Sequence, residues 1–363
     1  MRYLFIVGHP AHVHLFRNPI RLLTDRGHES LVGAVDREVT TQLLKAYGIR
    51  HFVFGKSLPE LISKGLDLLP KDLALLRRAR AFRPDILVST GSPYGAHVAS
   101  ILSKPHIVFG DTERASLITS LMAPFTDAIC TPSSFQGDLG HKHVRYNGYK
   151  ELAYLHPKYF EPNPTVVESV GLSPREPYIL MRFSAWDASH DIGDRGFAFK
   201  GPGSVGAVIG ELERYGRVVV LSDKGFTTDF QRYSLAVPPE LMHDVLAFAR
   251  LYFGEGATMA SEAGVLGVPW IFVSTAGRGF LTEQQERYGL GYWEASSSPA
   301  LEKAKTILAM PGWKATWMEK RGRLLRETID VTDFIVDFLT RWPDSFAALK
   351  SGSSQTSVSP RTG

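Results

Sequence analysis

The feature that most constrains this chain is a repeated alternation of short apolar segments with longer helical patterns. Continuous apolar strands separated by helices are typical of an open parallel sheet that is covered by helices on both faces. Helical patterns occur for example at His14–Asp25, Val39–Tyr47 and Lys71–Phe82. The expected strands of the first half are Tyr3–Val7, Ser30–Ala34, His51–Phe54, Ile86–Ser89, His106–Phe109 and Ala128–Thr131.

The alternation stops at a proline-rich stretch, His156 to Pro164, and then begins again. Proline removes a backbone donor and favours extended neighbours, so this stretch is typical of a linker. A chain of 363 residues is long enough to form two domains, each with its own core. We expect an N-terminal Rossmann-like domain over residues 1–157, a linker over 158–165, a C-terminal Rossmann-like domain over 166–345 and a disordered tail over 346–363. The expected strands of the second half are Tyr178–Arg182, Arg217–Leu221, Leu251–Phe253 and Trp270–Val273, with helices at Val205–Tyr215, Pro299–Ala309, Trp313–Glu327 and Val331–Trp342.

Composition and charge exclude several classes of protein. The single cysteine, Cys130, excludes an intrachain disulfide framework, and its apolar surroundings predict a buried thiol. A strand is expected from Tyr3 onward, without a preceding signal peptide, and no apolar run is long enough to span a bilayer. We therefore expect a cytoplasmic protein. A net charge of +4 does not by itself call for nucleic acid and is compatible with anionic substrates such as nucleotide diphosphates.

The loops after the expected strands are where chemistry is predicted, because open parallel sheets bind ligands beyond the carboxyl ends of their strands. The first loop holds His9, His12 and His14, without the Cys or carboxylate partners of a metal site. We interpret His12 as a general base or a substrate contact. A later loop offers Asp111 and Glu113 as catalytic candidates, and capping of the next helix by Asp111 or Thr112 also remains open.

The loop after Tyr178–Arg182 is dense in polar side chains. Arg182 at the strand end is predicted to meet a phosphate. Asp187 and His190 are predicted to act as acid–base or hydrogen-bonding residues.

The most informative segment is Gly254 to Pro269, after the strand Leu251–Phe253. Small residues at Gly256, Ala257 and Thr258 open a helix whose free N–H groups and positive dipole end suit a diphosphate. Glu262 lies one turn beyond Thr258 on the same face, where a carboxylate can accept hydrogen bonds from ribose hydroxyls. We assign Ser261 to the same site. A plain glycine-rich strand-to-helix turn is the alternative.

This segment resembles the nucleotide-binding stretch of GT-B proteins, including UDP-N-acetylglucosamine 2-epimerase and the lipid-linked glycosyltransferase of peptidoglycan synthesis. The resemblance implies an α/β fold of GT-B type, with two doubly wound Rossmann-like domains facing across a cleft. It also implies that Gly256, Ala257 and Thr258 hold the diphosphate and that Glu262 holds the ribose. The segment Val237 to Leu241, which includes Pro238, corresponds to the loop that contacts the base.

Across roughly residues 1 to 340 the chain resembles more closely an uncharacterised family, domain of unknown function 354, whose name implies no activity. The residues that carry this resemblance are Gly8–Val13, Arg83–Asp85, Asp111–Glu113, Tyr149–Pro157, Arg182 with Phe183, and His190 with Asp191.

The ribose glutamate of the epimerase is retained, whereas its catalytic residues are not. The epimerase has an arginine-bearing first loop, where this chain has His9 to His12, and its catalytic histidine falls near Arg182. We therefore expect a metal-independent glycosyltransferase of polysaccharide biosynthesis that uses a UDP-sugar, needs no cofactor, and has a glycan or lipid-linked acceptor. A sugar-nucleotide epimerase or hydrolase and a non-catalytic nucleotide-sugar-binding protein remain as alternatives.

The stretch Leu58–Phe82 combines regularly spaced leucines with Arg77, Arg78 and Arg80. We favour an ordinary helix that packs on the sheet with solvated arginines. Peripheral contact with an anionic membrane at the inner face is the alternative.

Overall fold

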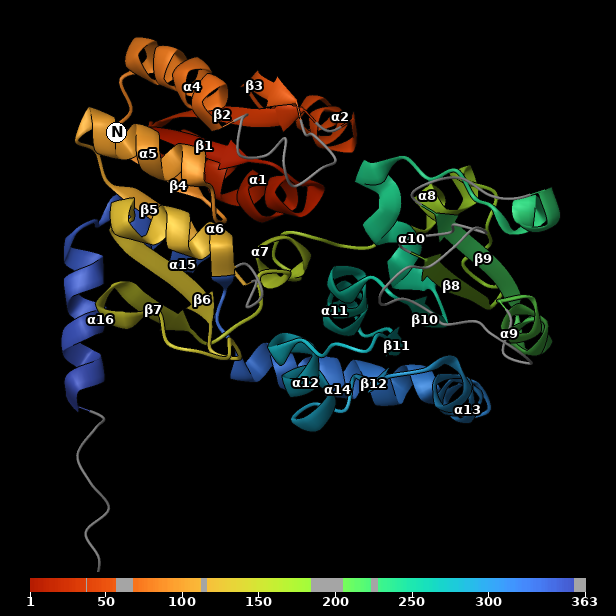
Figure 1. Cartoon of the computed structure of the whole chain (residues 1–363). Coiled ribbons are helices and arrows are strands. Elements are labelled where there is room, and N and C mark those ends of the chain that lie inside the picture. The colour runs from red at the N-terminus through yellow and green to blue at the C-terminus, as the bar shows by residue number, and fades with distance from the viewer. Residues whose placement is uncertain (37, 57–67, 112–115, 184–204, 223–227, 356–363) are drawn as a thin grey trace, which may run out of the picture. The chain divides into compact units, whose positions relative to one another are not determined.

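The computed structural model describes residues 1–36, 38–56, 68–111, 116–183, 205–222 and 228–355 (Figure 1). The chain divides into two compact units. Unit 1 comprises Met1–Tyr154 together with Ile329–Gly363, and unit 2 comprises Leu155–Thr328. Each unit contains one parallel sheet.

The sheet of unit 1 has seven strands in the order β3-β2-β1-β4-β5-β6-β7. All six strands predicted for this half are present, and the seventh, β7, was not predicted. The chain adds strands on one side of β1 and then on the other, so the order reverses between β1 and β4. The strands are β1 (Arg2–Val7), β2 (Glu29–Asp36), β3 (His51–Lys56), β4 (Ile86–Ser89), β5 (His106–Phe109), β6 (Ala128–Pro132) and β7 (His143–Tyr146).

Helices cover both faces of this sheet (Figure 1). On one face α1 packs against α2 and α15, and on the other α5 packs against α4 and α6. Buried strand side chains such as Phe5 and Cys130 fill the core between them, as predicted for the thiol. The helices are α1 (Pro10–Asp25), α2 (Glu38–Ala46), α4 (Leu68–Phe82), α5 (Pro93–Leu102), α6 (Ser116–Met122), η1 (Ala123–Phe125), η2 (Gly140–Lys142), α15 (Val331–Thr340) and α16 (Asp344–Gln355), while α7 (Leu152–Leu155) spans the boundary to unit 2.

The sheet of unit 2 has five strands in the order β12-β11-β10-β8-β9, and its order reverses between β8 and β10. The four predicted strands are confirmed and β12 is additional. The strands are β8 (Tyr178–Phe183), β9 (Arg217–Ser222), β10 (Leu251–Gly254), β11 (Trp270–Val273) and β12 (Gly291–Glu294). The helices are α8 (Pro164–Ser169), α9 (Val205–Leu212), η3 (Glu213–Tyr215), η4 (Thr228–Tyr233), η5 (Pro239–Leu241), α10 (Met242–Phe248), α11 (Ala257–Leu266), α12 (Gly279–Glu286), α13 (Ser297–Leu308) and α14 (Trp313–Glu327).

The domain boundaries differ from the predicted ones. Residues from Ile329 onward return to unit 1, although the sequence predicted that the second domain would extend to residue 345. The return rests on non-local contacts, which a local helical pattern does not reveal. The Ile329 N–H donates to the Asn147 carbonyl over 2.9 Å, and the Thr332 hydroxyl donates to the Ala153 carbonyl over 2.6 Å.

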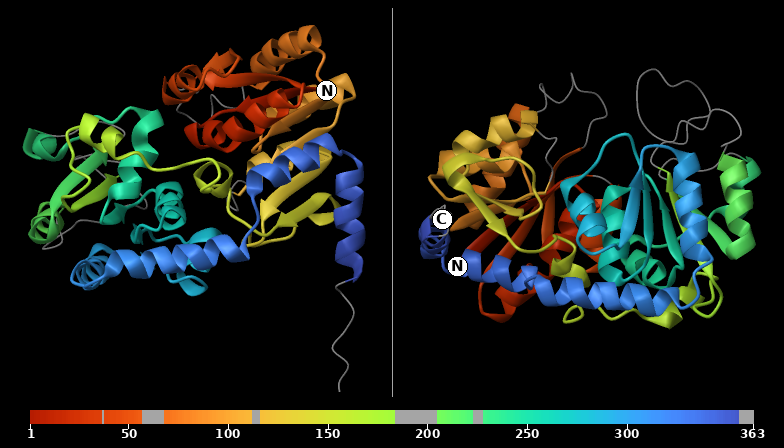
Figure 2. Two further views of the ribbon diagram at one scale, coloured as in Figure 1. Left: turned by 180° about the vertical axis from the view of Figure 1, so that it is seen from behind. Right: turned by 90° about the horizontal axis from the view of Figure 1, so that it is seen from below.

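The prediction of a disordered tail from residue 346 was wrong for the part of it that the structure describes. Helix α16 covers Asp344–Gln355, and residues 356–363 lie outside the described part of the chain. Figure 2 shows α15 and α16 in blue beside the strands of unit 1. Lys350 on α16 donates to the carbonyl of His143, so the helix is fastened to β7.

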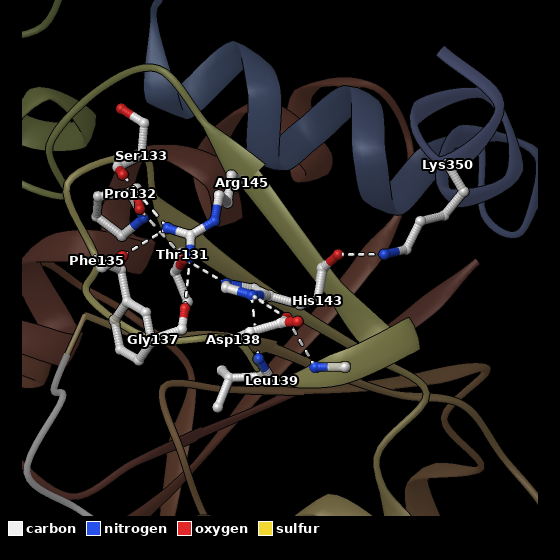
Figure 3. A network of polar contacts seen from close by, with 11 residues as sticks. Thr131, Pro132, Ser133, Phe135, Gly137, Asp138, Leu139, His143, Arg145 and Lys350 are labelled. Carbon is white, nitrogen blue, oxygen red and sulfur yellow. Dashed lines mark hydrogen bonds and ion pairs between the residues drawn. The ribbon is translucent and has the colours of Figure 1, made fainter. Parts of the chain in front are cut away.

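A polar network fixes the loop between β6 and β7 (Figure 3). The guanidinium of Arg145 donates to the carbonyls of Ser133, Phe135 and Gly137. His143 pairs through Nε2 with the Thr131 hydroxyl at 2.8 Å and accepts at Nδ1 from the Leu139 N–H. Burial lowers the pKa of His143, and the charge of Arg145 acts in the same direction. The backbone carbonyls of this loop therefore accept hydrogen bonds from Arg145, and these bonds fix the conformation of the loop.

The return of the chain to unit 1 predicts where a core mutation acts. Phe338 is 1% exposed, and its ring centroid lies 6.0 Å from that of Phe109 on β5. Phe338→Ala should destabilise unit 1 by about 3–5 kcal/mol, because a large buried ring is removed. Hydrogen exchange during urea unfolding would assign the loss to the strands of unit 1. Phe125→Ala, at an exposed ring, is the matched control, and accelerated exchange confined to β8–β12 would contradict the assignment.

Candidate functional site

The order of strands in unit 2 predicts a ligand site at the carboxyl ends of β8 and β10. Ligands of open parallel sheets bind where the strand order reverses. Gly254, the last residue of β10, pairs with Arg182 on β8. A Cβ atom at Gly254 would lie 2.3 Å from the Arg182 carbonyl oxygen, so only glycine permits this approach. The Glu255 N–H donates to the same carbonyl over 3.0 Å, which continues the pairing past the strand end.

The side chain of Arg182 lies against Gly256, the N-cap of α11. A Cβ atom at Gly256 would be 3.3 Å from Arg182 Cδ and 3.7 Å from Nη1. The Tyr252 hydroxyl accepts from the Gly256 N–H and donates to its carbonyl, each over 3.1 Å. Burial raises the pKa of Tyr252, and the positive charge of Arg182 acts in the opposite direction. Tyr252 therefore fixes the turn on which Arg182 rests.

Helix α11 begins with no side-chain cap at Gly256. The first N–H groups of a helix have no intrahelical partner, and the aligned peptide dipoles add about half a positive charge at this end. Ala257 and Thr258 are half-buried small residues in this first turn. Together with Arg182, the helix end forms an electropositive site that suits an oxyanion.

Glu262 lies one turn further along α11 and is 6% exposed. His243 on α10, 2% exposed, donates from Nε2 to Glu262 Oε1 over 3.1 Å. A buried carboxylate is costly unless it is paired, so His243 stabilises the charged form and orients it. His243 was not predicted from the sequence, because the packing of α10 against α11 is a tertiary contact. The available signal was a histidine two residues after the predicted base loop.

The segment around His243 is held on both sides. Phe160 packs edge-on against its ring, with the centroids 6.1 Å apart. Asp244, the next residue, accepts from the Asn163 N–H over 2.8 Å. Pro238, predicted to contact a base, is exposed just before η5 and α10. The predicted base loop therefore leads directly into the helix that orients Glu262.

Ser261, predicted to belong to the same site, has a protein partner in this structure. Its side chain is fully buried, and its hydroxyl accepts from Gln284 Nε2 on α12 over 2.7 Å. Ser261 therefore packs α11 against α12. A helical position next to Glu262 lies on a different face, which a short sequence motif does not resolve.

In unit 1, the histidines of the first loop organise the start of α1. His9 is the N-cap and accepts from the Ala11 N–H over 3.2 Å. His12 accepts at Nδ1 from the Gly8 N–H over 3.2 Å, so its neutral ring carries the proton on Nε2 and presents a donor there. His14 is buried, and its ring stacks on that of Tyr154 at 5.4 Å. His12 is thus the one of the three with a half-buried ring at the strand edge.

Asp111, just beyond β5, forms an ion pair with Lys150. Lys150 Nζ also lies 3.8 Å from Glu151 Oε1, and these three side chains are at most 15% exposed. Burial raises the pKa of Tyr146 well above its usual range, and the charges of Asp111 and Glu151 act in the same direction. Asp111 is therefore part of a buried charge cluster. Lys150 and Glu151 were not predicted as site residues.

Three predicted catalytic residues, Glu113, Asp187 and His190, lie outside the described residues.

Among the residues that are described, no group of three or more His, Cys, Asp or Glu side chains is arranged to hold a metal ion. Within the same part of the chain, no helix combines the length and apolar character needed to cross a membrane.

The corresponding edge of the unit 1 sheet, between β1 and β4, rests on a buried hydrogen-bond chain. The Gly91 N–H donates to the Ser89 hydroxyl, which pairs with His106 Nε2 at 3.0 Å. His106 Nδ1 pairs with the Thr126 hydroxyl at 2.9 Å, and that hydroxyl donates to the Met122 carbonyl. Because Thr126 uses its proton on Met122, His106 is neutral with its proton on Nδ1. Burial lowers the pKa of His106 to about 3, and the charge of His97 adds to the effect.

Comparison with known families identifies the chain. The model of the family described as protein of unknown function, DUF354, matches residues 4–280. The chain belongs to this family. No curated protein sequence matches it.

Solved structures show that this DUF354 protein has the GT-B fold, as predicted. UDP-GlcNAc 2-epimerase from Neisseria meningitidis, bound to UDP-GlcNAc, is similar with a TM-score of 0.65 and 12% identity, over 94% of this chain and 100% of that chain. S. aureus MnaA with UDP gives 0.65 and 12%, over 95% and 97%. The glycosyltransferase SsfS6 from Streptomyces sp. SF2575, complexed with thymidine diphosphate, gives 0.58 and 16%, over 92% and 99%.

The buried His106 predicts an acid-sensitive unit 1. Its pKa is lower in the folded state than the ordinary value of 6.5, so the unfolded chain binds more protons between these values. The contribution of neutral His106 to the free energy of unfolding is therefore complete above about pH 6.5, and it falls as the pH is lowered towards about 3. At about pH 4.5 the DUF354 protein should have lost about 2–3 kcal/mol through this group.

Urea unfolding of wild type and His106→Gln at about pH 7 and about pH 4.5 checks this, because glutamine does not titrate there. The decrease in the free energy of unfolding between the two pH values should be smaller in the variant by about 2–3 kcal/mol. His141→Gln, at an exposed histidine, is the control. Equal drops in wild type and His106→Gln would show that His106 does not carry the effect.

Proposed function

We propose that this DUF354 protein binds a nucleotide sugar, with UDP as the nucleotide, through unit 2 and transfers the sugar to an acceptor without a metal. One observation carries the proposal: Arg182 rests on the N-cap of α11, and Glu262 lies in the next turns of the same helix. The cation and the helix end suit the diphosphate of a sugar nucleotide. The carboxylate further along the helix suits the ribose that follows the diphosphate.

The diphosphate would bind at Gly256, Ala257 and Thr258. Its negative charge would be stabilised by the uncapped N–H groups and the helix dipole, and by Arg182 as a charge-assisted donor. The same groups would stabilise the charge that develops on the leaving diphosphate during transfer, which is how a site without a metal lowers the barrier.

The ribose would bind at Glu262. A carboxylate offers about four acceptor positions, so it can accept from His243 and from ribose hydroxyls through different lone pairs. The base would lie beside Pro238, whose loop precedes the helix that carries His243. Similar structures that contain UDP and UDP-GlcNAc support UDP as the nucleotide of this proposal. A similar structure that contains thymidine diphosphate makes that nucleotide, also a pyrimidine diphosphate, a second candidate.

The chemical step would use residues outside this nucleotide site. We assign acid–base roles to His12, Asp111 and Glu113 of unit 1 and to Asp187 and His190 of unit 2. The Nε2 donor of His12 suits a hydrogen bond to a reacting oxygen. A cytoplasmic enzyme of polysaccharide biosynthesis, with a glycan or lipid-linked acceptor, is consistent with this chemistry.

A second candidate function is epimerisation or hydrolysis of the sugar nucleotide itself, favoured by the similarity to two structures of UDP-GlcNAc 2-epimerase. Incubation with UDP-GlcNAc alone separates the two. Conversion of the sugar nucleotide without an acceptor would favour epimerase or hydrolase activity, whereas label transfer that requires an acceptor would support the transferase. Tight UDP binding without turnover over a broad acceptor panel would indicate a binding protein.

Glu262→Ala tests the ribose contact. The variant should bind UDP at least about tenfold more weakly, because it removes charge-assisted hydrogen bonds. Isothermal titration calorimetry measures the affinity. Glu319→Ala, at an exposed glutamate of α14 in the same unit, is the matched control and should bind as wild type does. Wild-type affinity in Glu262→Ala would exclude this residue from the site.

Gly256→Ala tests the diphosphate turn. The added methyl group would lie 2.8 Å from the Tyr252 hydroxyl and crowd Arg182, so UDP should bind at least about fivefold more weakly. Gly210→Ala is the control, because a Cβ atom there meets nothing within 4 Å. Thermal unfolding of both variants separates a local effect from loss of the fold. Unchanged affinity in a folded Gly256→Ala would contradict the proposed position of the diphosphate.

A further inference from the structure

Six of the twelve exposed large hydrophobic side chains in the described residues lie on consecutive helices of unit 1. We call the surface that they form the α4–η1 face. Helix α5 packs against α4, α6 and η1, so these elements lie side by side (Figure 1). Single exposed apolar residues are ordinary, but a contiguous group marks an interaction site. The six are Leu69 and Leu73 on α4, Ile101 on α5, Ile118 and Leu121 on α6, and Phe125 on η1.

Helix α4 carries apolar and basic residues on one exposed stripe. Leu69, Leu73, Arg77 and Arg80 follow one another at intervals of four, four and three residues, which places them on one side of the helix. All four are exposed. The opposite side, with Leu75 among its buried residues, packs on the protein. Leu69 is 67% exposed and Leu73 is 57% exposed, values far from those of a core-facing helix position.

The charge of the α4–η1 face is positive. The four elements contain one carboxylate, Asp72, and it is 15% exposed and lies 2.8 Å from His97 on α5. Arg78 lies over the ring of Phe52, within its own unit. Arg77 and Arg80 have no ion-pair partner among the described residues. The cations on this face are therefore directed to the solvent beside leucine side chains.

We propose that the α4–η1 face docks the protein on a membrane surface of anionic phospholipid. A bilayer interface offers both components that this face needs: acyl chains for Leu69, Leu73 and Phe125, and phosphate groups for Arg77 and Arg80. A second copy of the chain would bring the same positive charge to the contact. Each arginine at an anionic surface strengthens membrane partitioning by about fivefold.

Flotation of the full-length protein with vesicles tests this docking. We expect binding to vesicles of phosphatidylglycerol and phosphatidylcholine at low salt, and weak binding to phosphatidylcholine alone or at high salt. The double variants Leu73→Asp/Phe125→Asp and Arg77→Glu/Arg80→Glu should each bind at least about tenfold more weakly. Because all four residues are exposed, both variants should keep the melting temperature of the wild type.

Matched variants elsewhere on unit 1 serve as controls. Val53→Asp and Leu349→Asp change exposed apolar residues outside the face, and Arg21→Glu/Arg341→Glu changes exposed cations on α1 and at the end of α15. These should bind vesicles as wild type does. Failure of the wild type to bind anionic vesicles would overturn the proposal, as would equal losses in face and control variants. A dimer that Leu73→Asp/Phe125→Asp dissociates, without vesicle binding, would also overturn it in favour of a second copy.

Discussion

The candidate site of unit 2 depends on the close approach of β10 to β8. Gly254 carries no side chain, so its backbone reaches the Arg182 carbonyl at the edge where the strand order reverses. The same approach brings the Arg182 side chain over Gly256 and lets Tyr252 fasten the turn with two hydrogen bonds. The direction of α11 follows from that turn, and with it the position of Glu262. One glycine therefore determines how a cation, a helix end and a carboxylate lie relative to one another.

The two units use their polar residues differently. In unit 2 the buried polar pair of His243 and Glu262 orients a carboxylate beside an uncapped helix end. In unit 1 the buried polar groups mostly satisfy one another, as in the chain through His106 and the ion pair of Asp111 with Lys150. Such paired groups stabilise loops at a strand edge without requiring a ligand. The two units therefore differ in what their buried polar groups do: in unit 2 they orient a carboxylate, and in unit 1 they hold loops.

Most strands could be predicted from the sequence because central parallel strands are continuously apolar. The two that were missed, β7 and β12, lie at sheet edges and include charged residues such as Arg145 and Glu294, so the apolar signal is weaker there. Arg182, Gly256 and Glu262 could be found because strand ends and helix starts are local features. The burial of Ser261, the partnership of His243 and the return of α15 to unit 1 are tertiary contacts between distant residues, and no local pattern encodes them.

The split of unit 1 between the two ends of the chain has a consequence for synthesis. Thr332 is hydrogen-bonded to Ala153, and Ile329 to Asn147, so the chain leaves unit 1 and re-enters it at neighbouring points. Unit 2 is thus an insertion within unit 1, continuous from Leu155 to Thr328. On the ribosome, unit 1 begins first but lacks Phe334 and Phe338 over Phe109 until α15 has been made. Unit 2 is therefore the first of the two that the growing chain can complete, and the usual N-terminal-first order of domain folding is reversed.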